Sequence, residues 1–176
     1  MTATTDTTAK TDAVLGLGSN VGERRAALAA AVGALRAYPD IEIIAASPLY
    51  ETAPWGLTSQ QDFLNAAVRV GTSLAPADLL AAILAIEISL GRVRRKKWGP
   101  RSIDIDILVF GDEVIDGPGL TIPHPHLTER TFALAPLVDV MPDAIIKDRP
   151  ARQWLTQLGC KGLKEVSGPG WADPAG

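Results

Sequence analysis

The chain has 176 residues, of which 47% are hydrophobic and 21% are charged, and its formal net charge is −3 at pH 7. This composition predicts a globular protein and excludes a mostly disordered one, and the slight acidic excess argues against a general binder of nucleic acid. Cys160 is the only cysteine, which excludes an internal disulfide and a cysteine-ligated metal site and fits a cytoplasmic location.

The two ends of the chain are expected to lie outside the folded core. Residues 1–12 are polar and rich in threonine, which excludes a signal peptide and predicts a disordered tail. Residues 161–176 are expected to form a loose C-terminal extension. No apolar run approaches the roughly 20 residues that cross a bilayer, so no membrane partner is expected. A single domain over residues 13–160 is therefore predicted.

The first half of this domain predicts a strand, a helix and a second strand. Residues 14–17 are apolar and predict a buried strand. The glycine-rich run 16–22 predicts a tight turn into the helix, because it lacks the Lys-Ser/Thr ending of a phosphate-binding loop. Leucine and valine at helical spacing predict a helix over residues 23–37. An isoleucine-rich strand follows over residues 41–50, before turn residues interrupt it.

Two later segments alternate with the period of a strand. Over residues 63–70 one face carries Leu64, Ala66, Val68 and Val70, and the other carries Phe63, Asn65, Ala67 and Arg69. Over residues 102–110 the apolar face carries Ile103, Ile105, Ile107 and Val109, whereas Asp104 and Asp106 share the opposite face. Pro76 and Gly91 mark the start and end of a helix between these strands.

Helices are also expected over residues 128–140 and, more weakly, over 151–158. The order strand, helix, strand, strand, helix, strand matches a ferredoxin-like α+β fold, in which helices pack on one face of an antiparallel sheet.

Asp104 and Asp106 are the strongest candidates for a metal site. Two carboxylates at this spacing project from one face of a strand, roughly 7 Å apart along the backbone. Mg²⁺ prefers oxygen ligands and is commonly held by one or two carboxylates together with substrate phosphates. Two ions could bridge these side chains and a triphosphate. The alternative is a half-exposed strand with an acidic solvent face.

A cluster of positive charge precedes this pair. Six of the 17 basic residues lie within residues 92–101: Arg92, Arg94, Arg95, Lys96, Lys97 and Arg101. Glycine and proline interrupt the run, which predicts a flexible loop that closes over phosphate groups. A solvated charge run or a patch for nucleic-acid backbone is the alternative.

Three further features suggest a binding site. Glu87 falls on the apolar stripe of its helix, so it needs a partner such as a loop arginine, unless it reaches water at the edge of the stripe. His124 lies between two prolines, and with Arg130 it could hold phosphate oxygens. Phe63 and Asn65 share a strand face, and an aromatic ring beside an amide suits a flat heterocycle, with ordinary packing as the alternative.

The run from Trp98 to Ile107, with the letters WGPRSIDIDI, closely resembles the signature of the 6-hydroxymethyl-7,8-dihydropterin pyrophosphokinase family. Further similar segments occur in the same order: residues 16–20, 50–56, 63–68 and 122–132. The resemblance implies an enzyme of folate biosynthesis with a ferredoxin-like fold. Such an enzyme transfers pyrophosphate from ATP to 6-hydroxymethyl-7,8-dihydropterin and releases AMP. We expect these two partners, a monomer, and no nucleic-acid partner.

The resemblance also implies roles for individual residues. Two Mg²⁺ ions would be bound by Asp104 and Asp106. The pterin would be surrounded by Thr52, Trp55, Phe63, Asn65 and Phe132. The closing loop would contribute the catalytic residues Arg92, Arg94, Trp98 and Arg101. Contacts to ATP would come from Glu87, Ile107, Leu120, Thr121, His124 and Arg130. Phe63 departs from the tyrosine, and Lys97 from the arginine, that many members have at these positions.

Three other functions are compatible with parts of this pattern. A nucleotidyltransferase also places paired aspartates on a ferredoxin-like sheet, but it releases pyrophosphate. An RNA-binding module would use the basic loop and nearby aromatic rings. A sensor domain would bind a pterin without turnover.

Overall fold

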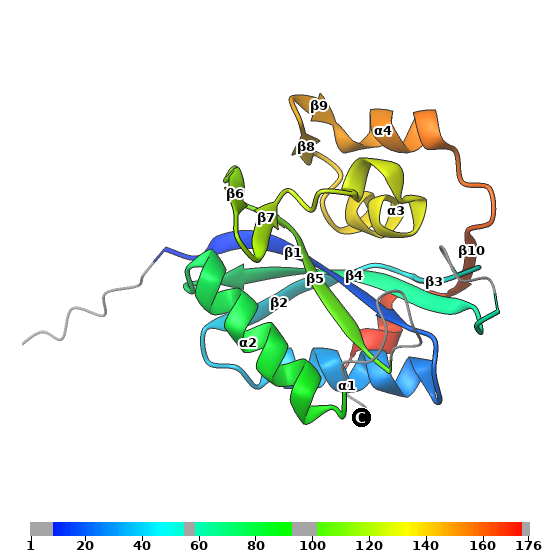
Figure 1. Cartoon of the computed structure of the whole chain (residues 1–176), viewed down its shortest axis with the longest axis horizontal. Helices are drawn as coiled ribbons and strands as arrows, with labels where there is room; N and C mark the ends of the chain where they lie inside the picture. Colours follow the sequence, from blue (N-terminus) through cyan, green and yellow to red (C-terminus); the bar gives the residue numbers. More distant parts are fainter. Residues whose placement is uncertain (1–8, 55–58, 93–101, 174–176) are drawn as a thin grey trace, which may run out of the picture.

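The computed structural model describes residues 9–54, 59–92 and 102–173, which form an antiparallel sheet with helices on both faces (Figure 1). The elements in chain order are β1 (Thr11–Ser19), α1 (Arg24–Arg36), β2 (Ile41–Ala46), β3 (Leu49–Thr52), β4 (Phe63–Thr72), α2 (Pro76–Ser89), β5 (Asp104–Phe110), β6 (Ile115–Gly117), β7 (Leu120–Ile122), the 3₁₀ helix η1 (Leu127–Glu129), α3 (Thr131–Val140), β8 (Ile145–Ile146), β9 (Arg149–Pro150), α4 (Ala151–Leu158), β10 (Lys164–Ser167) and the 3₁₀ helix η2 (Pro169–Ala172).

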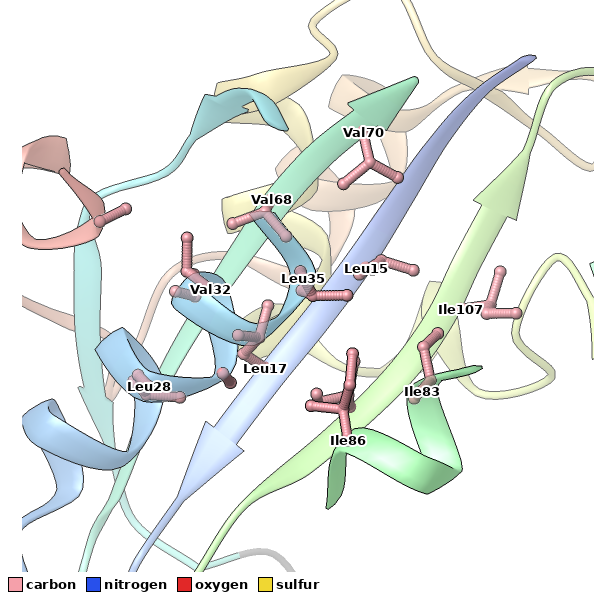
Figure 2. Close-up of a cluster of buried hydrophobic side chains, with 14 of the residues drawn as sticks. Leu15, Leu17, Leu28, Val32, Leu35, Val68, Val70, Ile83, Ile86 and Ile107 are labelled. Carbon is pink, nitrogen blue, oxygen red and sulfur yellow. The ribbon is translucent and has the colours of Figure 1, made fainter. Parts of the chain in front are cut away.

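The main sheet has the strand order β10-β3-β4-β1-β5, and β2 pairs with β4 beyond the end of β3. Helices α1 and α2 lie against one face, where their leucine, valine and isoleucine side chains pack on alternate residues of β1, β4 and β5 (Figure 2). Burial of this apolar surface is the main stabilising contribution to the fold. The predicted α+β class and the two helices of the ferredoxin-like pattern are confirmed.

The opposite face of the sheet is also covered, which the prediction of helices on one face did not include. Helix α3 lies on this face, and α4 packs beside it (Figure 1). A second apolar cluster forms there, which includes Leu134 and Leu137 of α3 and Val14, Ala67 and Leu108 of the sheet. This second layer supplies one wall of the candidate site.

Strand β5 contains an irregularity that changes one predicted face. Val14 pairs with Val109 and the next residue, Leu15, pairs with Ile107, so Leu108 is an extra residue opposite β1. Such a bulge reverses the alternation beyond it. The spacing predicted that Val109 shares a face with Ile103, Ile105 and Ile107. This is wrong, because Val109 lies in the cluster on the α3 face.

The predicted strand over residues 41–50 is two strands, because the chain leaves the ladder at Ser47 and Pro48. The loose C-terminal extension is also a wrong expectation for residues 164–172. There β10 pairs with β3, and the Trp171 side chain is 4% exposed in the core. The disordered tail predicted over residues 1–12 is wrong for Thr11 and Asp12, which pair with β4 as the start of β1, and residues 1–8 lie outside the described residues. In the part of the chain that the structure describes, none of the helices has the length and apolar character required to span a membrane.

Candidate active site

A pocket lies between the α3 face of the sheet and the start of α3. It contains about 850 Å³ of empty space, including open solvent at its mouth. Strands β3, β4, β1 and β5 form its floor. Eight of the predicted site residues line it: Thr52, Phe63, Asn65, Asp104, Asp106, His124, Arg130 and Phe132. The Asn65 face of β4 and the Asp104 face of β5 therefore line the same pocket.

The middle of the pocket floor is strand β1, which has glycine at positions 16 and 18. Gly18 of β1 pairs with Asn65 on one side and with Asp104 on the other, and Gly16 pairs with Ala67 and Asp106. Neighbouring strands lie about 4.8 Å apart, so the amide strand β4 and the carboxylate strand β5 are about 10 Å apart, with β1 between them. The floor is backbone at Gly18, whereas the Leu108 side chain lies over Gly16. The turn predicted for residues 16–22 is thus wrong for Gly16 and Gly18, which are strand residues facing the pocket.

The amide of Asn65 is fixed in orientation. Its Nδ2 donates a hydrogen bond to Oγ1 of Thr52 over 2.7 Å, and both side chains are buried. Its Oδ1 is directed toward β1, where a Cβ atom added to Gly18 would lie 3.1 Å from it. A hydrogen-bonding group with one defined orientation is suited to recognise the edge of a heterocycle.

Replacing Gly18 with alanine is expected to disturb this amide. The added methyl group is closer to Oδ1 of Asn65 than ordinary contacts allow, so the amide has to move by a few tenths of an ångström. We expect the KM for a pterin substrate to rise by about tenfold, the effect of weakening one buried hydrogen bond. Gly33→Ala is the control, because nothing lies within 4 Å of its added Cβ in helix α1. Equal KM values for the two variants would contradict this role.

At the other end of the pocket Asp104 is connected to a buried ion pair. Nη2 of Arg92 lies 3.1 Å from Oδ1 of Asp104, and Nη1 of the same guanidinium contacts Oε2 of Glu87. The second oxygen of Glu87 accepts a hydrogen bond from the Ile105 amide over 2.7 Å. Burial raises the pKa of Glu87, although the Ile105 amide and Arg92 act in the opposite direction. The predicted arginine partner of Glu87 is confirmed, and it is Arg92.

His124 faces Asp106 from the segment after β7. The backbone amide of His124 donates to the carbonyl of Leu108 over 2.9 Å, which aligns this segment with β5. Nδ1 of His124 accepts from the amide of His126, so the neutral ring carries its proton on Nε2, 4.0 Å from Oδ2 of Asp106. Burial, with Arg130 as the next cause, lowers the pKa of His124 to about 4. At neutral pH the ring is an uncharged donor at the carboxylate end.

Four other predicted residues that the structure describes do not line the pocket. Ile107 lies on the opposite face of β5 in the apolar core, and Leu120 and Thr121 belong to β7. Glu87 lies behind Arg92 and is 1% exposed. For these four residues a contact with ATP stays a prediction from the resemblance. Four others lie outside the described residues: Trp55, Arg94, Trp98 and Arg101.

Sequence reasoning missed several residues that line the pocket: Gly16, Leu17, Gly18, Ala53, Ala66, Leu108 and Ala133. The spacing of the two glycines was the available signal, because residues two apart in a strand face the same side. The small apolar residues carry no comparable signal.

The two carboxylates of Asp104 and Asp106 suit a magnesium ion better than a metal ion that is held entirely by protein side chains. Within residues 9–54, 59–92 and 102–173, no group of three or more histidine, cysteine, aspartate or glutamate side chains is arranged to hold a metal. Mg²⁺ needs only one or two carboxylates, because phosphate oxygens and water complete its shell. The two aspartates line an open pocket beside Arg130 and His124, so a phosphate group has room to approach them.

Comparisons with known proteins agree with this arrangement. The sequence model of the family described as 7,8-dihydro-6-hydroxymethylpterin-pyrophosphokinase matches residues 14–142. A 2-amino-4-hydroxy-6-hydroxymethyldihydropteridine pyrophosphokinase of Methylorubrum extorquens is 46% identical over 89% of this chain and 99% of its own length. The enzyme of the same name from Pseudomonas aeruginosa is 42% identical over 86% of this chain and 94% of its own length.

Solved structures share the fold at low sequence identity. A crystal structure of HPPK-DHPS in complex with substrates has a TM-score of 0.72 and 17% identity, covering 90% of this chain and 46% of that chain. Plasmodium falciparum wild-type HPPK-DHPS with pteroate has a TM-score of 0.71 and 19% identity, covering 89% and 46%. This chain thus spans about half the length of those chains. On the family match and the close relatives, the chain belongs to the 7,8-dihydro-6-hydroxymethylpterin-pyrophosphokinase family and is a pyrophosphokinase of folate biosynthesis.

Proposed function

We propose that this pocket binds ATP and 6-hydroxymethyl-7,8-dihydropterin together, and that the chain transfers the β,γ-pyrophosphoryl group of ATP to the pterin and releases AMP. The observation that carries the proposal is the shared floor. The fixed amide of Asn65 and the carboxylates of Asp104 and Asp106 face one hollow, and Gly18 is the residue between Asn65 and Asp104.

The two ends of the pocket suit different chemical groups. Near β3 and β4, Phe63 and Phe132 offer aromatic surfaces, and the Asn65–Thr52 pair offers directed polar atoms. We assign this end to the pterin ring, because flat heterocycles are held by stacking and by a few oriented hydrogen bonds. The hydroxymethyl group would then extend over Gly18 of β1 toward β5.

The end near β5 suits phosphate. Arg130 and His124 line it beside the two aspartates, and Arg92 approaches Asp104 from behind. We assign Mg²⁺ to Asp104 and Asp106, with two ions as the predicted number. Bound there, the metal would neutralise phosphate charge and polarise the β-phosphorus. A guanidinium and an uncharged imidazole donor would orient the remaining phosphate oxygens.

In the proposed reaction the pterin hydroxymethyl oxygen forms a bond to the β-phosphorus. The bond from that phosphorus to the oxygen of the α-phosphate breaks, AMP leaves with that oxygen, and the hydroxyl proton passes to solvent. Transfer of this kind demands little covalent chemistry from the protein, so the chain contributes positioning and electrostatic stabilisation. Gly18 leaves the floor between Asn65 and Asp104 without a side chain of its own.

Product analysis tests this function directly. Full-length protein is incubated with ATP, MgCl₂ and 6-hydroxymethyl-7,8-dihydropterin, and the nucleotides are separated by chromatography. We expect AMP to form in equal amount to the pterin diphosphate, and EDTA to stop the reaction. Formation of ADP would contradict transfer of a pyrophosphoryl group. Release of free pyrophosphate would favour the nucleotidyltransferase alternative, and pterin binding without turnover would favour a sensor. A cytoplasmic, monomeric enzyme stays a prediction.

A further inference from the structure

We infer that residues 164–172, called here the C-terminal strap, position the pterin end of the pocket through strand β3. The inference rests on the proposed binding of the pterin at that end. The strap lies outside residues 14–142, which the family model matches. It consists of β10 and η2, and Figure 1 shows it running past β3 to the side of the sheet on which α1 lies.

The strap makes β3 an interior strand. On one edge β3 pairs with β4, including Thr52 with Phe63. On its other edge β3 pairs with β10, where Ser167 lies opposite Leu49 and Glu165 opposite Tyr50. Because β3 has only four residues, a single ladder with β4 would leave it short and open on one side. Pairing on both edges restrains its position along the sheet.

The strap also anchors the start of β3. Nε1 of Trp171 donates a hydrogen bond to the carbonyl of Ser47 over 2.8 Å, and the indole is 4% exposed. Ser47 is itself bound to β4, because its amide donates to the carbonyl of Ala67 and its Oγ accepts from the amide of Ala67. Arg36 of α1 donates to the carbonyl of Ala172 over 3.1 Å, which fastens the end of the strap. Ser47, at the break between β2 and β3, is thus hydrogen-bonded both to the strap and to β4.

The position of β3 matters at its other end, where Thr52 enters the pocket. Its Oγ1 accepts the 2.7 Å hydrogen bond that orients the Asn65 amide. The space around that amide is tight, since even a methyl group on Gly18 would crowd it. A small displacement of β3 therefore changes the orientation of the amide at the pterin end. The carboxylate end lies on β5, which is separated from β3 by two intervening strands, β4 and β1, and it is not coupled to the strap in this way.

Substituting Trp171 with phenylalanine removes the indole donor while keeping an aromatic ring. We expect the KM for 6-hydroxymethyl-7,8-dihydropterin to rise by on the order of two- to tenfold, the equivalent of one hydrogen bond, while the KM for ATP stays within about twofold. Trp154→Phe is the matched control. Its indole also donates to a backbone carbonyl, that of Ile146 over 2.9 Å, but it lies on α4 and packs against the apolar cluster of the α3 face.

A second pair of variants covers the case in which Trp171→Phe fails to fold. Arg36→Gln releases the other anchor of the strap from the surface of α1, and Arg25→Gln changes an exposed arginine of the same helix. We expect only Arg36→Gln to raise the pterin KM and to speed hydrogen exchange of the β3 amides.

The outcomes separate the two proposals. A pterin KM that is unchanged in both Trp171→Phe and Arg36→Gln, or that rises together with the ATP KM, would show that the strap only fills the core. Equal effects in Trp171→Phe and Trp154→Phe would overturn the inference as well. A wild-type chain without turnover of the pterin would instead refute the proposed function, whatever the strap does.

Discussion

Asp106→Ala is expected to abolish pyrophosphoryl transfer while leaving the fold intact. The Asp106 side chain is 46% exposed and lines the pocket, so its loss should change the free energy of unfolding by no more than about 0.5 kcal/mol. A metal ligand supplies several kcal/mol of transition-state stabilisation, so we expect kcat to fall by about 1,000-fold or more. The measurement is the rate of AMP formation, with unfolding in urea followed by circular dichroism.

Asp116→Ala is the control for this variant. Asp116 is an exposed carboxylate of β6 and does not line the pocket. Its replacement by alanine changes the net charge by the same amount as Asp106→Ala. We expect near wild-type turnover from it. An Asp106→Ala enzyme that keeps a substantial part of its activity would refute the assignment of a metal to this strand, because the change would then be tolerated like that of any surface aspartate.

Glu87→Ala is expected to have the largest effect on stability. The side chain is 1% exposed and uses both oxygens, one for the Ile105 amide and one for Arg92. Breaking a buried ion pair from one side costs about 3–5 kcal/mol, because the remaining charge and donor lose their partner. The midpoint of urea unfolding should therefore move to a clearly lower concentration, without a change in the slope of the transition.

Two further variants resolve the origin of this loss. Glu87→Gln keeps an oxygen acceptor for the Ile105 amide and removes only the charge opposite Arg92, so its cost should be smaller. Glu42→Ala breaks the exposed ion pair with Lys10, in which Glu42 is 63% exposed, and should cost less than about 1 kcal/mol. If Glu87→Ala were no more destabilising than Glu42→Ala, the buried ion pair between Glu87 and Arg92 would not contribute to the stability of the fold.

The alternation of residues within β4 and β5 was the most informative feature of the sequence. A period of two assigns Asn65 and Asp104 to polar faces with no knowledge of the fold, because successive side chains of a strand point to opposite sides. The same pattern predicted the apolar residues that α1 and α2 cover. Helix ends were also readable where their chemistry is specific, as at Pro76, which begins α2.

Other features depend on pairing between distant segments and were not readable. The register of β1 against β4 and β5 places Gly18 between Asn65 and Asp104, and no local pattern encodes that register. The extra residue in β5 is a property of the paired ladder, which is why the face of Val109 was predicted wrongly. The four residues of β10 are mostly polar, and they form a strand because an edge of β3 is available to them.

The hydrogen bonds that other segments make to the backbone of β5 affect whether a strand of another molecule can pair with it. The amide of Ile105 is occupied by the Glu87 carboxylate, and the carbonyl of Leu108 accepts the amide of His124. A strand from a second molecule would have to displace a buried acid and a histidine segment before it could join the sheet at these positions. Protection of this kind guards against aggregation through the edges of a sheet, and here it is provided by Glu87 and His124, two residues that also lie near the carboxylates.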